Sequence, residues 1–240
     1  DSTDSQDLRL NCKNKRYACN VTADHFDMYG VDYTINDRLT AQYHYSELED
    51  IYRQQFVGLL GNQPLGSGVL KADMRVIDSA DSGAARAGSI DNRALSAMLA
   101  YAINSHTFSA GWQRMNGDNS MPYLDGSNPY LVNYVQVNDF AAAQERSWQL
   151  RYDYDFKGIG LDGLTFLTRY VNGDHIKVPG SDVEGKEWER DSELKYVVQS
   201  GTFKDVSLRL RNATYRTNYE KFARDVDETR LIVSYNFSVL

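Results

Sequence analysis

Apolar and mostly polar positions alternate along the last stretch of the chain, 230–240. The apolar set is Leu231, Val233, Tyr235, Phe237 and Val239. Successive side chains of a β-strand point to opposite faces, so this alternation predicts a strand with one apolar and one polar face. Such a strand suits a membrane barrel, with lipid on one side and a water-filled lumen on the other.

The same alternation recurs upstream. In 148–156, Trp148, Leu150 and Tyr152 share one face, while Arg151 and Asp153 lie on the other. Charged residues fall almost only on the face opposite the apolar set. Strands are expected at 23–34, 38–46, 52–60, 69–78, 93–103, 107–115, 148–156, 164–171, 192–200, 205–214 and 230–240. The pattern therefore predicts an all-β fold, a transmembrane antiparallel barrel with about eleven strands in this chain.

The expected connections alternate in length. Short turns are expected at 36–37, 61–68, 104–106, 158–163 and 200–204. Long loops are expected at 79–92, 116–146, 172–191 and 215–227, with the short connection 47–51 as the one irregularity. Short turns at one rim and long loops at the other are typical of an outer-membrane barrel, with the periplasm at the first rim and the outside at the second.

Bacterial single-chain barrels have even strand numbers, and eleven is odd. We therefore expect this chain to be the C-terminal part of a longer barrel, unless 1–22 contains a twelfth strand. The chain begins in polar sequence without an initiator Met, which fits processing or truncation. Segment 1–22 is interpreted as part of an outer loop.

Composition narrows the class of protein. The 240 residues include 17 Tyr and only 4 Pro, which favours strands. No apolar run approaches the roughly 18 to 20 residues of a membrane-spanning helix. The net charge is −7, and no basic block alternates with aromatic residues, so nucleic acid is not an expected partner.

Cys12 and Cys19 are the only cysteines and lie in a polar segment. This placement predicts a loop disulfide in an oxidising, periplasmic or surface setting. A zinc site is the weaker alternative because there is no second cysteine pair and no suitably spaced histidine. No catalytic constellation is visible, so we expect neither an enzyme nor a cofactor.

Basic residues recur at positions that face the expected lumen. They are Arg151, Arg169, Lys195, Arg209 and Arg211. A series of such groups could pass an anion along the pore without trapping it, since a guanidinium pairs readily with a carboxylate. The alternative is that they pair with inward Asp153, Asp155 and Glu193 to hold the wall together. Different members could serve either purpose.

The loop 116–146 is longer than a connection needs and is rich in Tyr, Leu and Val. Folded into the lumen, it would narrow the pore. The alternative is a surface loop that packs on its neighbours. The acidic runs 182–191 and 225–228 are interpreted as a solvated outer rim, where divalent ions could bridge to lipopolysaccharide, rather than as a metal site.

Five segments, in order, carry a family resemblance. They are SWQLRYDYDF at 147–156, GLTFLTRYVNG at 163–173, KYVVQSG at 195–201, SLRLRNA at 207–213 and RLIVSY at 230–235. With these segments the chain resembles the OprD family, the substrate-specific outer-membrane carboxylate channels of pseudomonads. The resemblance implies a barrel of about eighteen strands, narrowed by inward-folded loops and lined by a ladder of basic residues.

Carried over by motif, the resemblance assigns two sets of residues. The ladder set is Arg151, Arg169 and Arg211, with Arg209 and Lys195. The loop 116–146 matches the family's second constriction loop and gives Tyr123, Asp125, Ser127, Asn133 and Tyr134 as eyelet residues. The family's other constriction loop would lie upstream of this chain.

Segments 122–134 and 187–191 resemble the OccK and benzoate-channel-like branch of the family, which takes aromatic and cyclic carboxylates such as benzoate or vanillate. The expected function is passive uptake of small carboxylates across a bacterial outer membrane. The alternatives are a basic amino-acid channel of the same family, a general porin and, remotely, a soluble β-sandwich binding module. Expected partners are carboxylate solutes, outer-membrane lipid and lipopolysaccharide, with the pore inside one chain, in a monomer or loose trimer.

Overall fold

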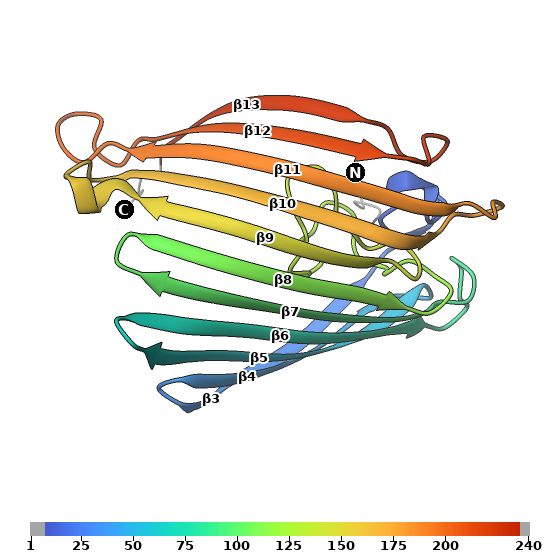
Figure 1. Ribbon diagram of the computed structural model, residues 1–240. Helices are drawn as coiled ribbons and strands as arrows, with labels where there is room; N and C mark the ends of the chain where they lie inside the picture. The colour runs from blue at the N-terminus through green and yellow to red at the C-terminus, as the bar shows by residue number, and fades with distance from the viewer. Residues whose placement is uncertain (1–7, 236–240) are drawn as a thin grey trace, which may run out of the picture.

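The computed structural model describes residues 8–235, and strands form most of it (Figure 1). Eleven strands make one antiparallel sheet in which each strand pairs with its neighbour in sequence, from β3 at one edge to β13 at the other. The strands are β3 Phe26–Asn36, β4 Leu39–Leu48, β5 Tyr52–Leu65, β6 Gly68–Asp81, β7 Asp91–Ile103, β8 His106–Asn116, β9 Arg146–Asp155, β10 Leu164–Lys177, β11 Glu184–Val197, β12 Ser207–Thr217 and β13 Val226–Ser234. The predicted all-β class and number of strands are confirmed; residues 236–240 of the predicted last strand lie outside the described residues.

The two faces of the sheet differ as the alternation predicts. Leu150, Leu194, Leu210 and Leu231 are 42–72% exposed on the outer face. So much exposed apolar surface is unfavourable in water and favourable against lipid. The opposite face is polar and concave. Among the described residues, no helix is long and apolar enough to cross a membrane.

The predicted difference in length between the connections at the two rims is only partly right. β10 and β11 extend to a loop at 178–183, so most of the predicted loop 172–191 is strand. Apolar alternation is absent there because outward positions, including Asn172, Lys186 and Arg190, are polar or charged like the inward Glu187 and Glu189. Backbone pairing nevertheless continues through them. Only the connection 117–145 is much longer than the others.

Two segments lie on the concave side of the sheet (Figure 1). One is the connection 117–145, named here the inner loop. The other is the N-terminal segment 8–25, which contains β1 Leu8–Arg9, the 3-10 helix η1 Lys13–Lys15 and β2 Thr22–Ala23. A disulfide joins Cys12 to Cys19 in this segment. The remaining short element, the 3-10 helix η2 Phe156–Ile159, lies between β9 and β10 at the rim of the short turns.

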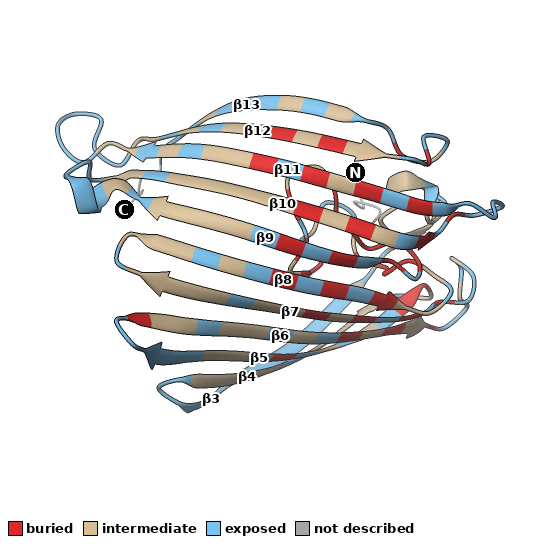
Figure 2. Ribbon diagram, in the orientation of Figure 1, coloured by how far each residue is buried: buried red, intermediate tan, exposed pale blue. Residues whose placement is uncertain are grey.

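Buried residues gather under the inner loop, toward the long-loop ends of the strands (Figure 2). One cluster joins wall residues Ile77, Ala94 and Met115 to Met121 and Leu131 of the loop. A second cluster packs Leu10, Leu48, Ile51, Tyr52 and Ile90, and so joins the N-terminal segment to the wall. The apolar contacts hold both segments against the inner face.

Candidate functional site

Basic side chains occupy three successive rows on the inner face of β9 to β13. Residues in one row are cross-strand partners, and rows are two residues apart, which is about 6.7 Å along a strand. From the long-loop end to the short-turn end the rows hold Arg151 with Arg169, Arg211 with Arg230, and Lys195 with Arg209. The register therefore brings all five sequence-predicted ladder residues together on one wall.

Carboxylates neutralise most of this wall. The ion pairs are Arg151 with Asp153 at 2.6 Å, Arg169 with Asp191 at 2.7 Å, Arg209 with Glu193 at 3.4 Å, and Arg211 with Glu193. Asp191 is 4% exposed, so Arg169 is tied to a buried group. Within residues 8–235, Lys195 has no ion-pair partner. Lys195 is thus the ladder member whose charge is least compensated.

Side chains of this wall line a hollow of about 450 Å³ toward the short-turn end of the strands. Arg151, Lys195 and Arg209 line it, together with Asp153 and Glu193. The hollow lies in the half of the wall that the inner loop does not cover, near the short turns. A solute crossing this half would meet positive and negative groups side by side.

The inner loop is fixed to the wall by buried amide groups. Gln113 on β8 donates a hydrogen bond to the carbonyl of Phe140 at 2.8 Å and accepts one from the backbone N–H of Asn133 at 3.1 Å. The side chain of Asn133 donates to Ser147 Oγ at 2.8 Å and accepts from Gln149 at 3.0 Å. Buried polar groups satisfied in this way specify one position for the loop.

Buried carboxylates on β11 hold the next part of the loop. Glu189 accepts hydrogen bonds from the backbone N–H groups of Val137 and Asn138, both at 2.8 Å. Glu187 accepts from the Asn138 side chain and from the hydroxyl of Tyr219. Both carboxylates are 1% exposed. The expectation that run 182–191 forms a solvated rim is therefore wrong for these residues, because the inner loop covers them.

Contacts with distant strands show how far the loop extends. They are Gln54 of β5 with the carbonyl of Pro122 at 3.0 Å, Arg75 of β6 with the carbonyl of Tyr130 at 2.7 Å, and Glu228 of β13 with the side chain of Gln136 at 2.8 Å. The loop thus crosses the concave side from β5 and β6 to β13. Gly173 permits its close approach, since a Cβ there would lie 2.2 Å from Glu145 Oε1.

Arg16 and Asp139 join the N-terminal segment to the inner loop. Arg16 Nη1 lies 2.7 and 2.8 Å from the two carboxylate oxygens of Asp139, and both side chains are buried. The hydroxyl of Tyr123 also donates to Asp139, at 2.7 Å. Burial alone would raise the pKa of Asp139, but the charges of Arg16 and Lys13 and the hydrogen bonds hold that pKa well below its usual range.

The five eyelet residues predicted from the sequence fall into two groups. Tyr123 and Asn133 are buried and hydrogen-bonded, so their side chains fix the loop. Ser127 is half-buried and donates its hydroxyl to a backbone carbonyl of the same loop. Asp125 and Tyr134 are exposed.

A second hollow, of about 330 Å³, lies between the inner loop and β3 to β6. The rings of His44 and Phe56 are 5.3 Å apart, and Tyr130 of the loop is 5.9 Å from Phe56. The hollow is lined by these rings together with other apolar side chains and side-chain amides. Arg75 lies beside it through its contact with Tyr130. None of these residues was singled out from the sequence.

Sequence reasoning also missed Arg16, Asp139 and Arg230. Arg230 could have been found, because it occupies an inward-facing position of its strand and is the hairpin partner of Arg211. Arg16 and Asp139 are far apart in non-periodic segments, and no local pattern pairs them. Within the described chain no cluster of three or more His, Cys, Asp or Glu residues could hold a metal ion.

The apolar outer face and polar, charged inner wall define the class: this is an outer-membrane β-barrel. The family model for "outer membrane porin, OprD family" matches residues 1–239. The chain is 39% identical to Porin D of Pseudomonas aeruginosa over 91% of its length, and covers 54% of that protein. It is 38% identical to the porin-like protein GalP of Pseudomonas putida, again over 91%, and covers 52% of it.

Solved structures give higher identities. Pseudomonas aeruginosa OccK10 (OpdN) is 65% identical with a TM-score of 0.94, over 98% of this chain and 66% of the other. OccK5 (OpdH) of the same species is 60% identical with a TM-score of 0.92, over 98% and 63%. The chain belongs to the OprD family of outer-membrane porins. It spans about half the length of the curated relatives it matches.

Proposed function

We propose that the protein containing this chain is a passive channel through which small carboxylates cross the outer membrane. The observation that carries the proposal is the set of three basic rows, which begins at the edge of the inner loop and continues across the open half of the inner wall. An anion could move from row to row, because about 6.7 Å separates them and each offers only weak, partly compensated attraction. Weak binding at several stations allows fast release.

Aromatic carboxylates are the proposed substrates. The hollow lined by His44, Phe56 and Tyr130 would contact the ring of such a solute. Arg75 beside it is ion-paired with Asp73 at 2.5 Å and would present a partly compensated positive charge to the carboxylate. The exposed inner-loop residues Asp125 and Tyr134 would sieve solutes by size and polarity. The resemblance of segments 122–134 and 187–191 to the benzoate-channel-like branch supports the same class.

A general porin is the second candidate. The ion pairs of Arg151, Arg169, Arg209 and Arg211 favour it, because paired charges can serve the wall alone. A basic amino-acid channel of the same family is the other alternative, since the carboxylates of Asp153 and Glu193, which also line the hollow near the short turns, would attract a basic solute. We propose that the pore lies within one chain, in a monomer or loose trimer that contacts lipid and lipopolysaccharide, and that transport involves no covalent chemistry or cofactor.

Uptake into proteoliposomes that carry the full-length barrel tests the proposal. Labelled benzoate and labelled arginine are compared, each with the other as competitor. Saturable benzoate uptake that arginine does not inhibit is the expected result. A preference for arginine would support the basic amino-acid channel, and unsaturable flux of both would support the general porin.

Variants of the ladder sharpen this test. Replacing Arg151 and Arg211 with Ala should slow benzoate flux more than the flux of a neutral solute of similar size. Equal slowing of both would leave these residues a structural role only.

A further inference from the structure

A row of aromatic residues marks the membrane boundary on the outer face. Trp112 of β8 is the cross-strand partner of Trp148 of β9, and both are more than 40% exposed. Tyr170 of β10 lies 5.6 Å from Trp148 and 5.7 Å from Trp188 of β11. Tryptophan and tyrosine concentrate where acyl chains meet headgroups. This row therefore lies at the interface toward the long-loop rim.

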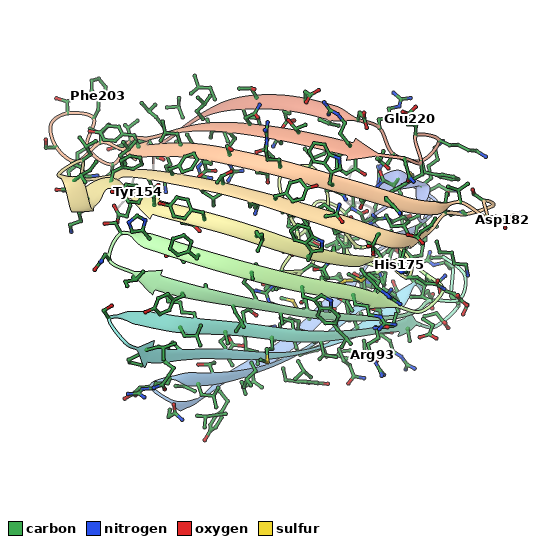
Figure 3. All side chains as sticks on the ribbon, viewed as in Figure 1. Arg93, Tyr154, His175, Asp182, Phe203 and Glu220 are labelled. Atoms are coloured by element: carbon green, nitrogen blue, oxygen red, sulfur yellow. A yellow bond between two sulfur atoms is a disulfide. The ribbon has the colours of Figure 1, made fainter. Side chains whose placement is uncertain are left out.

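Arg114 and Arg146 lie one step beyond this row. They are also cross-strand partners, each two residues from its tryptophan on the side of the long loops. That step is about 6.7 Å, which places both guanidinium groups among the headgroups. Both residues are exposed. Figure 3 shows this rim, with His175 and Asp182 labelled near it.

Two like charges face each other here without a counter-ion. Within residues 8–235, neither Arg114 nor Arg146 forms an ion pair. Asp174 is the register partner of Arg146, but its carboxylate contacts the ring of His175 at 2.5 Å. Like charges directly opposite on neighbouring strands destabilise a sheet. An external anion would remove this cost.

Neighbouring outer-face arginines do not share this arrangement. Arg93 is paired with Asp78 at 2.5 Å, and Arg216 with Asp227 at 2.8 Å. These pairs show that acidic partners are available at this rim. Arg53 and Arg190 on the same face also lack an ion pair within residues 8–235, but neither has a second arginine as its cross-strand partner. The facing pair of arginines is what distinguishes Arg114 and Arg146 from them.

A hollow of about 420 Å³ adjoins the arginine pair. Its lining includes Arg114, Arg146, His175 and Lys177, and also Asn116, Gln144, Ser181, Asp182 and Glu184. Lys177 is paired with Asp118 at 2.8 Å, which leaves the two arginines as its uncompensated cations. Its size suits a sugar headgroup better than a bare phosphate ion.

We propose that Arg114 and Arg146 bind a phosphate group of an outer-leaflet glycolipid. The guanidinium forks would grip the phosphate, the polar lining would contact the sugar, and Trp112 and Trp148 would pack on the acyl region below. The inference makes the proposed contact with lipopolysaccharide specific. It does not depend on which solute the channel carries, so lipid binding and solute flux can fail separately.

Native mass spectrometry of the full-length barrel tests the site with three probes: bisphosphorylated lipid A, dephosphorylated lipid A and inorganic phosphate. The wild type should bind bisphosphorylated lipid A in preference to the other two. The double variant Arg114→Ala, Arg146→Ala should bind it at least about tenfold more weakly, since two charge-assisted contacts are lost. Arg114→Lys with Arg146→Lys should retain part of the affinity, because each ammonium keeps its charge.

The matched control is Arg93→Ala, which removes an arginine of the same face and rim that already has a partner. It should leave lipid A binding within about twofold of the wild type. Benzoate flux through the double alanine variant should be unchanged. Unaltered lipid A affinity in that variant, or equal affinity for dephosphorylated lipid A, would overturn the proposal. Inorganic phosphate that displaces lipid A at equal concentration would show a free-anion site and would also overturn it.

Discussion

The two halves of the inner wall use charge in opposite ways. Under the inner loop, Glu187 and Glu189 are almost fully buried, and each accepts hydrogen bonds from named groups of the loop. Toward the short turns, Arg151 and Arg211 are about one-third exposed and meet acids that are also partly exposed. Buried charges need complete partners, whereas exposed charges can exchange theirs. The covered half therefore fixes a structure, and the open half is available to solutes.

The largest expected effect comes from breaking the buried pair of Arg16 and Asp139. Asp139→Asn keeps the side-chain shape but leaves the Arg16 guanidinium buried without its counter-charge. Losing one partner of such a pair costs about 3 kcal/mol or more, so local opening of the inner loop should become about a hundredfold more frequent. Chymotryptic cleavage within 117–145, which contains Tyr123, Tyr130 and Tyr134, measures that opening in the detergent-solubilised full-length barrel.

Asp125→Asn is the matched control, because Asp125 is an exposed acid of the same loop. Its cleavage rate should stay near that of the wild type. The double variant Arg16→Gln, Asp139→Asn should lose less than the sum of the single variants, since no buried charge is then left alone. Strict additivity would show that the two residues act independently and would contradict the buried-pair account.

A second test concerns pH at the covered half. Burial, followed by the charge of Glu187, raises the pKa of Glu145 in the inner loop, so this residue is neutral over a wider range than usual. A carboxyl whose pKa is raised by folding stabilises the fold fully below its unfolded pKa of about 4.3. That stability is lost as pH rises through the folded pKa. Cleavage of the loop should therefore accelerate toward alkaline pH.

Glu145→Gln removes the titrating proton and keeps a group that can donate to Glu187. The variant should show a flatter rise of cleavage rate with pH than the wild type, with little change at low pH. Asp125→Asn, at an exposed acid of the same loop, provides the control and should leave the pH profile unchanged. An identical profile in Glu145→Gln and the wild type would assign the pH dependence to another group.

Sequence patterns predicted the wall far better than what covers it. The number of strands and the face of residues such as Leu150 and Arg151 followed from alternation, which each strand carries locally. Arg151 and Arg169 could be placed on one wall for the same reason, although their direct register could not. The long-loop end of β11 was predicted as loop because outward Lys186 and Arg190 are charged like the inward Glu187 and Glu189, so the apolar-polar contrast is lost.

The covering segments could not be predicted because their contacts join distant parts of the chain without periodicity. Arg16 reaches Asp139 across more than a hundred residues, and no spacing rule pairs them. Asn133 is buried because the side-chain amides of Gln113 on β8 and Gln149 on β9 form hydrogen bonds with it. From sequence alone such amides would be expected to face water. The motif around Asn133 predicted a residue that faces the pore constriction, whereas its hydrogen bonds show that it fixes the inner loop to the wall.

The smallest expected effect separates members of the ladder from one another. Lys195 has no ion-pair partner in the described chain, whereas Arg169 is tied to the buried Asp191. One unit charge near a solute in water contributes about 1 kcal/mol, so Lys195→Ala should slow benzoate flux by about fivefold. Arg169→Ala should act mainly on stability, because it leaves Asp191 buried without its partner.

Single-channel and liposome flux measurements on the two variants distinguish these roles when a neutral solute is run beside benzoate. Lys195→Ala should change the ratio of benzoate to neutral flux and leave the melting temperature unaltered. Arg169→Ala should lower the melting temperature and change both fluxes together. If Lys195→Ala left the ratio unchanged, the open half of the wall would be architectural like the covered half, and the contrast between them would be one of exposure alone.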